Sequence, residues 1–340
     1  MTDTLLQAYT PLLVWSLLGI GVIQFFPESL PRFLGRSLYW VGVPLEIFAL
    51  SRQTDWSAQV GLAPSITIAT LFGGLLLSVS ILAGLRWLSS LQPAEAAIAA
   101  PPSSASSVSP PLVWQASSRQ GSFLLSSVIG NTGFVGLAIA PTLIDQNYLG
   151  WIVFYSVTNN IIGTYGLGVW LASAYGRHAT SDSAWWKPLR DVFTVPTLWA
   201  FVLGFTTHNL TFPGAIEQGL KTSVWIVIPI ALLLMGMRLR QLKGWQSLRL
   251  AIAPTFLKVL IIPALVGLAT TLLALPPAPR LAMVLMSGMP TAFAGLILAE
   301  EYNLDRDLIA SSILLSTLAL LLTIPLWLWL FATPTWIAGA

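Results

Sequence analysis

The sequence has no cysteine, only 2 histidines and few charged side chains, which make up 9% of its 340 residues. Without cysteine there can be no disulfide bond, thiolate catalysis or cysteine metal site. The sequence also lacks an HExxH motif, a phosphate-cradling GxxxxGK motif and a pair of carboxylates at metal-binding spacing, so we expect no cofactor and no ATP hydrolysis within the chain. His178 lies in a basic loop and His208 near the end of an apolar run, and neither position suits a catalytic dyad with Ser156 or Ser287. We therefore expect a protein that is not an enzyme.

Apolar residues dominate what is present. They form 55% of the chain, the mean hydropathy is +0.78, and there are 15 tryptophans. Soluble domains are about 25% charged, so this composition predicts an integral protein of the cell membrane, in contact with the lipid bilayer. The net charge of +3 does not predict a nucleic-acid partner, because nearly all Lys and Arg lie between apolar runs, as orienting loop charges do.

Ten apolar runs approach or exceed the roughly 20 residues that cross a bilayer. The runs cover residues 9–26, 33–50, 64–88, 121–144 and 150–175, and then 193–210, 216–237, 248–275, 281–299 and 308–331. No Lys or Arg precedes the first run, so we interpret it as a mature span and not as a signal peptide. The predicted fold is an all-α integral membrane protein with about ten transmembrane helices.

The runs divide the chain into two halves. Residues 1–176 form a first five-helix repeat, residues 177–192 a cytoplasmic linker, and residues 193–340 a second five-helix repeat. Because five is odd, the second repeat is inverted relative to the first. Residues 93–118, rich in Pro, Ala and Ser, have too few large apolar groups to pack, so we expect a disordered loop there.

The distribution of cations predicts the orientation. The odd-numbered connections hold 12 Lys and Arg residues, whereas the even-numbered connections and both tails hold 3. Cytoplasmic loops of membrane proteins carry the excess of positive charge. We expect the odd connections in the cytoplasm and both termini outside it.

An internal repeat marks the centre of each half. NTGFVGLAIA begins at Asn131 and PTAFAGLILA begins at Pro290, 159 residues later, and five columns are identical. Both copies interrupt an apolar run with Gly, Asn or Pro, and such breaks are tolerated in a bilayer only beside protein or a water-filled cavity. Matched breaks in two halves point to a transporter's binding site. We expect helices 4 and 9 to be broken and to cross there.

The breaks predict an anion site, because new half-helices begin with free N–H groups and a partial positive charge. Asn131, Thr132 and Thr291 could cap these half-helices, and Pro290 suits a first turn. With Gly133 they are our candidate substrate-binding residues. The alternative is that the glycines at 130, 133, 136, 288 and 295 only allow close helix packing.

Other polar residues lie within the apolar runs. Lys258 is nine residues beyond Arg249, about 14 Å into the membrane, where an ionisable group is usually functional. We expect it to bind the substrate, or else to neutralise Glu46. Glu46 is itself a candidate for ion coupling or for a charge pair, or it could be neutral and simply hydrogen-bonded. Asn159 and Asn160 could bind substrate or Na⁺, or could simply join helices by hydrogen bonds.

Three segments carry a resemblance to a known family: GNTGFVGLAIAP in the fourth run, VGVPLEIFAL at residues 41–50, and residues 287–328, which begin with SGMPTAFAGLILAEE. The sequence resembles the auxin efflux carrier family, the PIN-like permeases, whose fold is related to bile acid:sodium symporters. The tract between the fifth and sixth runs is short, unlike the large hydrophilic loop of plant carriers, which favours a bacterial-type member.

The resemblance implies a fold and a mechanism. Helices 1, 2, 6 and 7 would form a scaffold, and helices 3–5 and 8–10 a transport domain that moves like an elevator, commonly within a homodimer. The implied function is secondary active transport of a small organic anion, such as a carboxylate or an auxin-like acid, bound at the crossing of helices 4 and 9. The alternatives are a sodium-coupled symporter of the bile acid type and a membrane receptor or channel without transport turnover.

Overall fold

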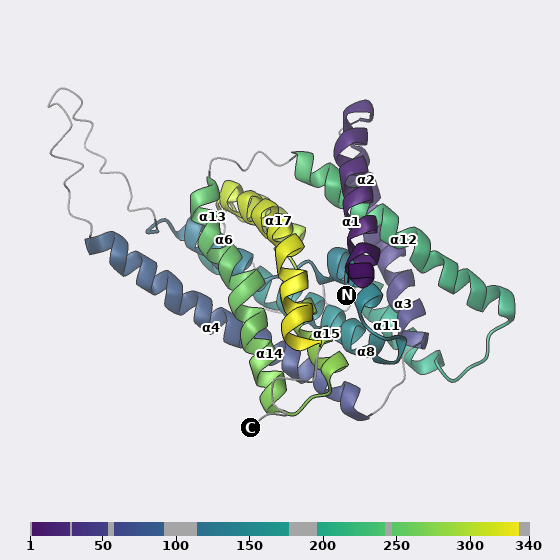
Figure 1. Ribbon diagram of the computed structural model, residues 1–340. Coiled ribbons are helices and arrows are strands. Elements are labelled where there is room, and N and C mark those ends of the chain that lie inside the picture. The colour runs from purple at the N-terminus through teal and green to yellow at the C-terminus, as the bar shows by residue number, and fades with distance from the viewer. Residues whose placement is uncertain are drawn as a thin grey trace, which may run out of the picture.

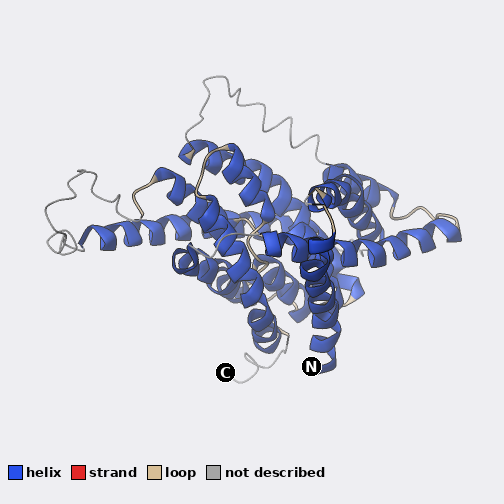
Figure 2. Cartoon of the chain, turned by 90° about the horizontal axis from the view of Figure 1, so that it is seen from above, coloured by secondary structure: helices blue, strands red, loops and turns tan. Residues whose placement is uncertain are grey.

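The computed structural model describes residues 2–27, 29–53, 58–91, 114–176, 196–241 and 247–332. Within these ranges the chain is built from helices, and its only β-type pairing is one isolated bridge (Figures 1 and 2). The prediction of an all-α membrane protein is confirmed.

Each predicted apolar run coincides with one helix or with consecutive helical segments. In the first half these are α1 (Thr2–Val22), α2 (Leu30–Ser37), η2 (Leu38–Gly42), α3 (Val43–Gln53), α4 (Leu62–Leu91), α6 (Ser117–Val128), η4 (Thr132–Gly136), α7 (Leu137–Leu143), α8 (Leu149–Thr158), η6 (Asn159–Gly168) and α9 (Val169–Tyr175). In the second half they are α11 (Pro196–Thr207), α12 (Gly214–Gln241), α13 (Leu248–Phe256), η8 (Leu257–Ile261), α14 (Ile262–Leu272), α15 (Pro277–Ser287), α16 (Phe293–Glu301) and α17 (Arg306–Phe331).

Five helical segments in the described residues are long and apolar enough to cross a membrane. They cover Leu30–Gln53, Leu62–Ser90, Gly214–Gln241, Leu248–Leu272 and Arg306–Phe331. Of the other predicted spans, the fourth and the ninth are broken, the first and the sixth contain shorter apolar helices, and the fifth is helical throughout Leu149–Tyr175 but is not among these five. The number of crossings therefore stays a prediction, although the membrane character of the chain does not depend on it.

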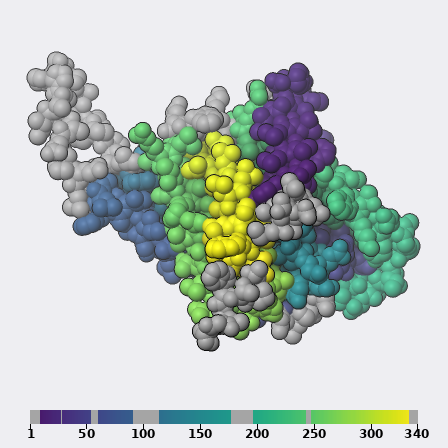
Figure 3. Space-filling view, in the orientation of Figure 1, coloured from purple at the N-terminus to yellow at the C-terminus, as the bar shows by residue number. Residues whose placement is uncertain are grey.

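The helices form two groups. α1 packs against α12, and α3 packs against both α11 and α12; in the other group α4 packs against α6, α13 against α17, and α14 against α15. Figure 1 shows α1, α3, α11 and α12 on the right, with α4, α6, α13 and α14 on the left. In the space-filling view the yellow α17 runs between the green α13 and α14 and the purple N-terminal helices (Figure 3).

Glycine permits the closest approach within the first group. A Cβ atom at Gly236 of α12 would collide with the Ser16 carbonyl of α1, and one at Gly19 would collide with the Leu233 carbonyl. At the equivalent crossing of α3 and α11, a Cβ atom at Gly204 would lie 2.9 Å from the Phe48 carbonyl oxygen. The first predicted span (α1) thus pairs with the seventh (α12), and the sixth (α11) pairs with the second (α3).

Two predicted segments fall mainly outside the described residues. These are residues 93–113 of the tract rich in Pro, Ala and Ser, and the linker at 177–192. The end of the first segment was placed wrongly, because residues 114–118 are ordered. Trp114 is buried with its ring edge-on to Phe123, its carbonyl accepts a hydrogen bond from Gln120, and α6 begins at Ser117.

Candidate functional site

The two predicted breaks meet each other. α6 ends at Val128 and α15 ends at Ser287, and the segments after them pair in an antiparallel bridge between Gly130 and Thr291. The N–H of Asn131 donates to the carbonyl of Pro290 (2.7 Å), and the N–H of Ala292 donates to the carbonyl of Ile129 (3.0 Å). Each break therefore satisfies backbone groups that the other leaves free, as a non-helical segment inside a membrane requires.

Buried side chains brace this bridge. Asn159 donates from Nδ2 to the Gly130 carbonyl (3.1 Å) and to Thr132 Oγ1 (3.0 Å). Thr291 donates from Oγ1 to the Ser126 carbonyl (2.9 Å), and its N–H donates to Ser316 Oγ (3.0 Å). Asn159, Thr132 and Thr291 are all buried, so these bonds hold the crossing in one geometry.

The starts of the half-helices match the predicted caps at only one position. Asn131 caps η4, because its Oδ1 accepts a hydrogen bond from the Phe134 N–H (3.3 Å). Thr291 is not a cap, since its hydroxyl bonds across to α6, and Thr132 is already inside η4. Pro290 is not in a first turn either: α16 begins at Phe293 with Ala292 at its N-cap, and Pro290 belongs to the bridge.

Lys258 lies where the two half-helices end. Its Nζ donates to the carbonyl of Val128 (3.2 Å), the last residue of α6, and to the carbonyl of Ser287 (3.0 Å), the last residue of α15. The residue is 2% exposed, and a Cβ atom at Gly130 would lie 2.9 Å from Nζ. The ammonium thus faces the negative ends of two helix dipoles, where a cation is stabilising. No carboxylate of the described residues lies within ion-pair distance of it, so Lys258 does not neutralise Glu46.

Glu46 is buried in α3 without a counter-charge. It is 2% exposed, and its Oε1 has no hydrogen-bond partner among the described residues. The predicted charge pair is therefore absent from the described structure. A role in ion coupling stays a prediction.

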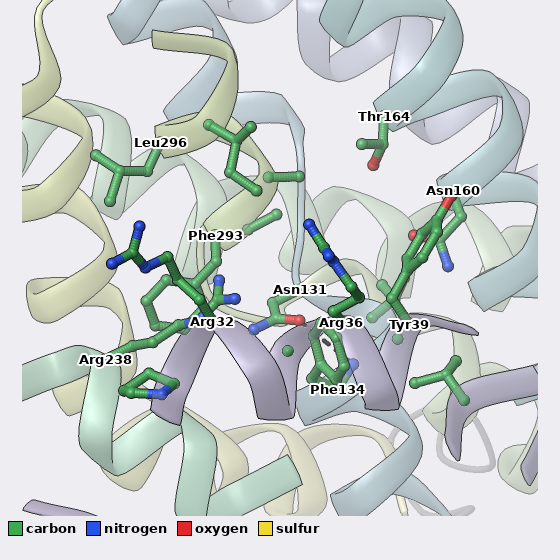
Figure 4. Close-up of a pocket in the computed structure, with 18 of the residues that line it drawn as sticks. Arg32, Arg36, Tyr39, Asn131, Phe134, Asn160, Thr164, Arg238, Phe293 and Leu296 are labelled. Atoms are coloured by element: carbon green, nitrogen blue, oxygen red, sulfur yellow. Dashed lines mark hydrogen bonds between the residues drawn. The ribbon is translucent and has the colours of Figure 1, made fainter. Parts of the chain in front are cut away.

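A cavity of about 780 Å³ opens at the crossing. Its walls come from both groups of helices. They include Arg32, Arg36, Tyr39 and Trp40 of α2 and η2, Asn131, Thr132, Gly133 and Phe134 of the first break and η4, Asn160, Thr164 and Tyr165 of η6, Arg238 of α12, Phe293 and Glu300 of α16, and Arg306 of α17. Figure 4 shows the arginines and Phe293 around Asn131, with Asn160 and Tyr39 together on the other side.

The cavity contains four of the predicted substrate-binding residues: Asn131, Thr132, Gly133 and Asn160. Pro290 and Thr291 lie in the bridge behind it, Asn159 braces that bridge, and Lys258 caps the helix ends. The crossing could therefore be predicted from the sequence, whereas the difference between residues that face the cavity and residues that build it could not.

The arginines of the cavity were missed as site residues. Arg32, Arg36 and Arg238 were counted among the orienting charges of the connections, because Arg32 and Arg238 flank apolar runs and Arg36 lies near the start of one. The helices extend beyond those runs, since α2 begins at Leu30 and α12 continues to Gln241, so all three side chains belong to helices that reach the crossing. The available signal was the spacing of Arg32 and Arg36, which places both on one helix face.

The possible sodium site at Asn159 and Asn160 stays a prediction, and the structure places the two side chains in different surroundings. Asn159 is buried in η6 against the bridge, whereas Asn160 lines the cavity. In the described part of the chain, no three His, Asp or Glu side chains are grouped as metal ligands.

Several known proteins are similar to this chain. One is an uncharacterized transporter of Methanocaldococcus jannaschii, 26% identical over 217 residues, which cover 62% of this chain and 68% of the relative. Another, from Methanothermobacter thermautotrophicus, is 26% identical over 204 residues, covering 60% of this chain and 65% of the relative. The uncharacterized transporter YfdV of Escherichia coli is 28% identical over 209 residues, covering 58% of this chain and 63% of the relative. The chain thus matches about two thirds of the length of each relative.

A family model described as membrane transport protein matches residues 112–328, which include both broken helices and the bridge between them. This range covers more than half of the chain, and the resemblance to PIN-like permeases is confirmed. The family and the named relatives are transporters rather than enzymes. The chain belongs to the membrane transport protein family, as a PIN-like permease of the bacterial and archaeal type.

Proposed function

We propose that the protein is a secondary active transporter that carries a small organic anion across the cell membrane. Membership of a transporter family supports transport as such. The proposal that the substrate is a small organic anion rests on the cavity at the crossing. Two broken helices, a set of amide and hydroxyl groups and several arginines converge there. Broken helices at the centre of inverted repeats form the substrate sites of many transporters.

The walls of the cavity favour an anion. Of the charged side chains that line it, four are arginines and one is a glutamate. Phe293 and Ala294, the first residues of the half-helix α16, also line it, so the positive end of a helix dipole lies at its wall. An excess of fixed positive charge raises the local concentration of anions and lowers the cost of binding them.

The position of the cavity between the two groups of helices supports an elevator mechanism. Arg32, Tyr39 and Arg238 come from helices 2 and 7, which we assign to the scaffold, whereas Asn131, Asn160 and Phe293 come from the proposed moving domain. A substrate at this boundary contacts both parts, so its binding can depend on their relative position. The bonds within the bridge and those made by Lys258 all lie inside the moving part, which can therefore shift as one body.

Binding in the purified protein provides the first test. A thermal-shift screen against mono- and dicarboxylates, with Na⁺ or with choline as the cation, should find carboxylates that raise the melting temperature. Stabilisation that appears only with Na⁺ would favour a sodium-coupled symporter. If no carboxylate stabilises the protein with either cation, the proposed substrate class is wrong.

A further inference from the structure

Most of the positive charge of the cavity has no negative partner among the residues that the structure describes. Arg306 is neutralised by Glu300, whose Oε1 lies 2.5 Å from its Nη2. Glu300 is also the only carboxylate among the lining residues of the described structure. Arg32, Arg36 and Arg238 form no ion pair with any other described residue. The cavity therefore retains three guanidinium groups that can attract an anion.

Arg238 differs from the other two arginines in its burial. Arg32 and Arg36 are exposed on one face of α2, where water can solvate their charges. Arg238 lies in the last turn of α12 and is half-buried, with its guanidinium carbon 5.2 Å from the centre of the Phe293 ring. Phe293 itself is buried, at the start of α16. Arg32 and Arg36 are thus placed to draw anions toward the cavity, and Arg238 is placed to hold one inside it.

The backbone is shaped to admit the Arg238 side chain. Gly35 of α2 is buried beside it, and a Cβ atom at this glycine would collide with Nη2 of Arg238. Any larger residue at position 35 would therefore push the guanidinium out of its present place. The close approach of Gly35 and the nearby Phe293 ring restrict where the guanidinium can lie, which limits the entropy lost when it binds a ligand.

The guanidinium of Arg238 makes no hydrogen bond to another described residue at this position. A partly desolvated charge without a partner is costly, and proteins normally compensate it with an opposite charge. Its planar donors match the two oxygens of a carboxylate, which they can bind in a bidentate manner. Asn131 and Phe293 line the cavity with it, and they also line a second, small void that adjoins Arg238.

We infer that Arg238, held between Gly35 and Phe293, binds the carboxylate group of the transported substrate. The inference rests on the proposed function and names the residue that recognises the anion. Arg238 comes from the proposed scaffold and Phe293 from the moving domain, so movement of that domain would alter the contact that holds the anion. The empty carrier has an unpaired charge at this position, and binding of a carboxylate neutralises it.

The test measures ligand-induced thermal stabilisation of the purified full-length protein, with benzoate, succinate and inorganic phosphate as probes. Arg238→Gln should weaken the apparent affinity for carboxylates about ten- to a hundredfold, as expected when a charged hydrogen-bond partner is lost. Arg238→Lys should lie between this variant and the wild type. Gly35→Ala keeps the charge but displaces the group, and it should also weaken binding. Arg240→Gln is the matched control, because Arg240 is exposed on the same helix and donates to the Ile20 carbonyl; its affinity should equal that of the wild type.

The stability of the protein without ligand separates a binding role from a structural one. Removing an unpaired, half-buried charge should leave the melting temperature of Arg238→Gln equal to or above that of the wild type, whereas loss of a structural contact would lower it. A lower melting temperature with unchanged affinity would overturn the inference. Unchanged affinity in a stable Arg238→Gln would overturn the role inferred for Arg238. The proposal that the protein binds an organic anion would then still stand. If phosphate stabilises the wild type but neither carboxylate does, the assignment of a carboxylate ligand is wrong. If none of the three probes stabilises the wild type, both this inference and the proposed function are wrong.

Discussion

Lys258 places a buried positive charge against the carbonyl ends of α6 and α15. Its depth and charge were visible in the sequence, and they suggested a contact with the substrate. Its actual partners were not visible, because they are backbone groups that become free only when two distant helices break side by side. The structure favours a supporting role for Lys258. We propose Arg238 instead as the cation that binds the anion.

Lys258→Met should therefore reduce the stability of the fold more than substrate affinity. The variant leaves two buried carbonyl groups without a donor, at a cost of about 1–3 kcal/mol for each group. The free energy of unfolding in detergent measures this loss, and Lys221→Met, at an exposed position of α12, is the control. Lys258→Gln should lose less stability, and its folded fraction should bind carboxylates within about threefold of the wild-type affinity. A stable Lys258→Met, or a large loss of affinity in folded Lys258→Gln, would contradict the supporting role and indicate that Lys258 binds the substrate.

Asn131 combines two roles that Asn131→Ala should separate. The substitution removes the cap of η4, which costs about 1 kcal/mol of stability, and it removes an amide from the wall of the cavity. We expect a folded protein with only a slightly lower melting temperature and with transport reduced by tenfold or more, as about 1.4 kcal/mol of lost binding would give. Initial rates of uptake into proteoliposomes measure the second effect. The same substitution at exposed Asn147 should leave both quantities unchanged, and normal transport by Asn131→Ala would remove this residue from the site.

At the scale of helices, the internal repeat was the informative pattern. Because the two copies of the repeat have identical residues at five aligned positions, the sequence predicted that helices 4 and 9 would both break. In the structure these breaks follow Val128 and Ser287. The exact starts of the new half-helices could not be predicted. Thr291 has two possible hydrogen-bonding directions, along its own helix or across to Ser126, and only the neighbouring helix determines which one it takes.

Pro290 prevents α15 from continuing into α16. A leucine at this position supplies a backbone N–H and permits helical geometry, so Pro290→Leu should favour a continuous ninth helix and disrupt the bridge to Asn131. We expect folded protein with little or no transport, measured as uptake per amount of monodisperse protein. Pro229→Leu, within the scaffold helix α12, is the control and should retain transport. Wild-type rates in Pro290→Leu would show that the break serves packing alone.

The crossing of α1 and α12 depends on Gly236. Gly236→Ala should reduce the yield of folded protein severely, because its methyl group would collide with the Ser16 carbonyl. Gly219→Ala in the same helix meets no atom within 4 Å and should be neutral. Size-exclusion profiles of the two detergent-solubilised variants make the comparison. Equal profiles would mean that α1 and α12 do not approach as closely as described.

At the scale of the whole molecule, the all-α membrane fold follows from hydrophobicity and the repeat, whereas the cavity does not. A run of apolar residues predicts where a helix can cross a bilayer, but it does not show how far the helix extends beyond the apolar run. The helical extensions that carry Arg32 and Arg238 supply much of the charge in the cavity.

The inverted arrangement that we predict for the two halves has a testable consequence for topology. A reporter fused after Ala340 should be outside the cytoplasm, and one inserted at Ser104 should be inside it, because 12 cations against 3 favour this orientation. Paired alkaline phosphatase and fluorescent protein fusions measure both positions. A cytoplasmic C-terminus would contradict the count of ten spans and the orientation of the second repeat.

Counterflow in proteoliposomes tests the central claim most directly. Vesicles that contain the purified protein are loaded with an unlabelled carboxylate that stabilises it, and entry of the labelled carboxylate is followed over time. A carrier that exposes one site alternately to each side should show saturable entry with a transient accumulation above equilibrium, and Asn131→Ala should lower the rate of this entry by tenfold or more. Flux that neither saturates nor responds to internal carboxylate would indicate a channel, and no flux above that of empty vesicles would contradict the proposal that this protein transports organic anions.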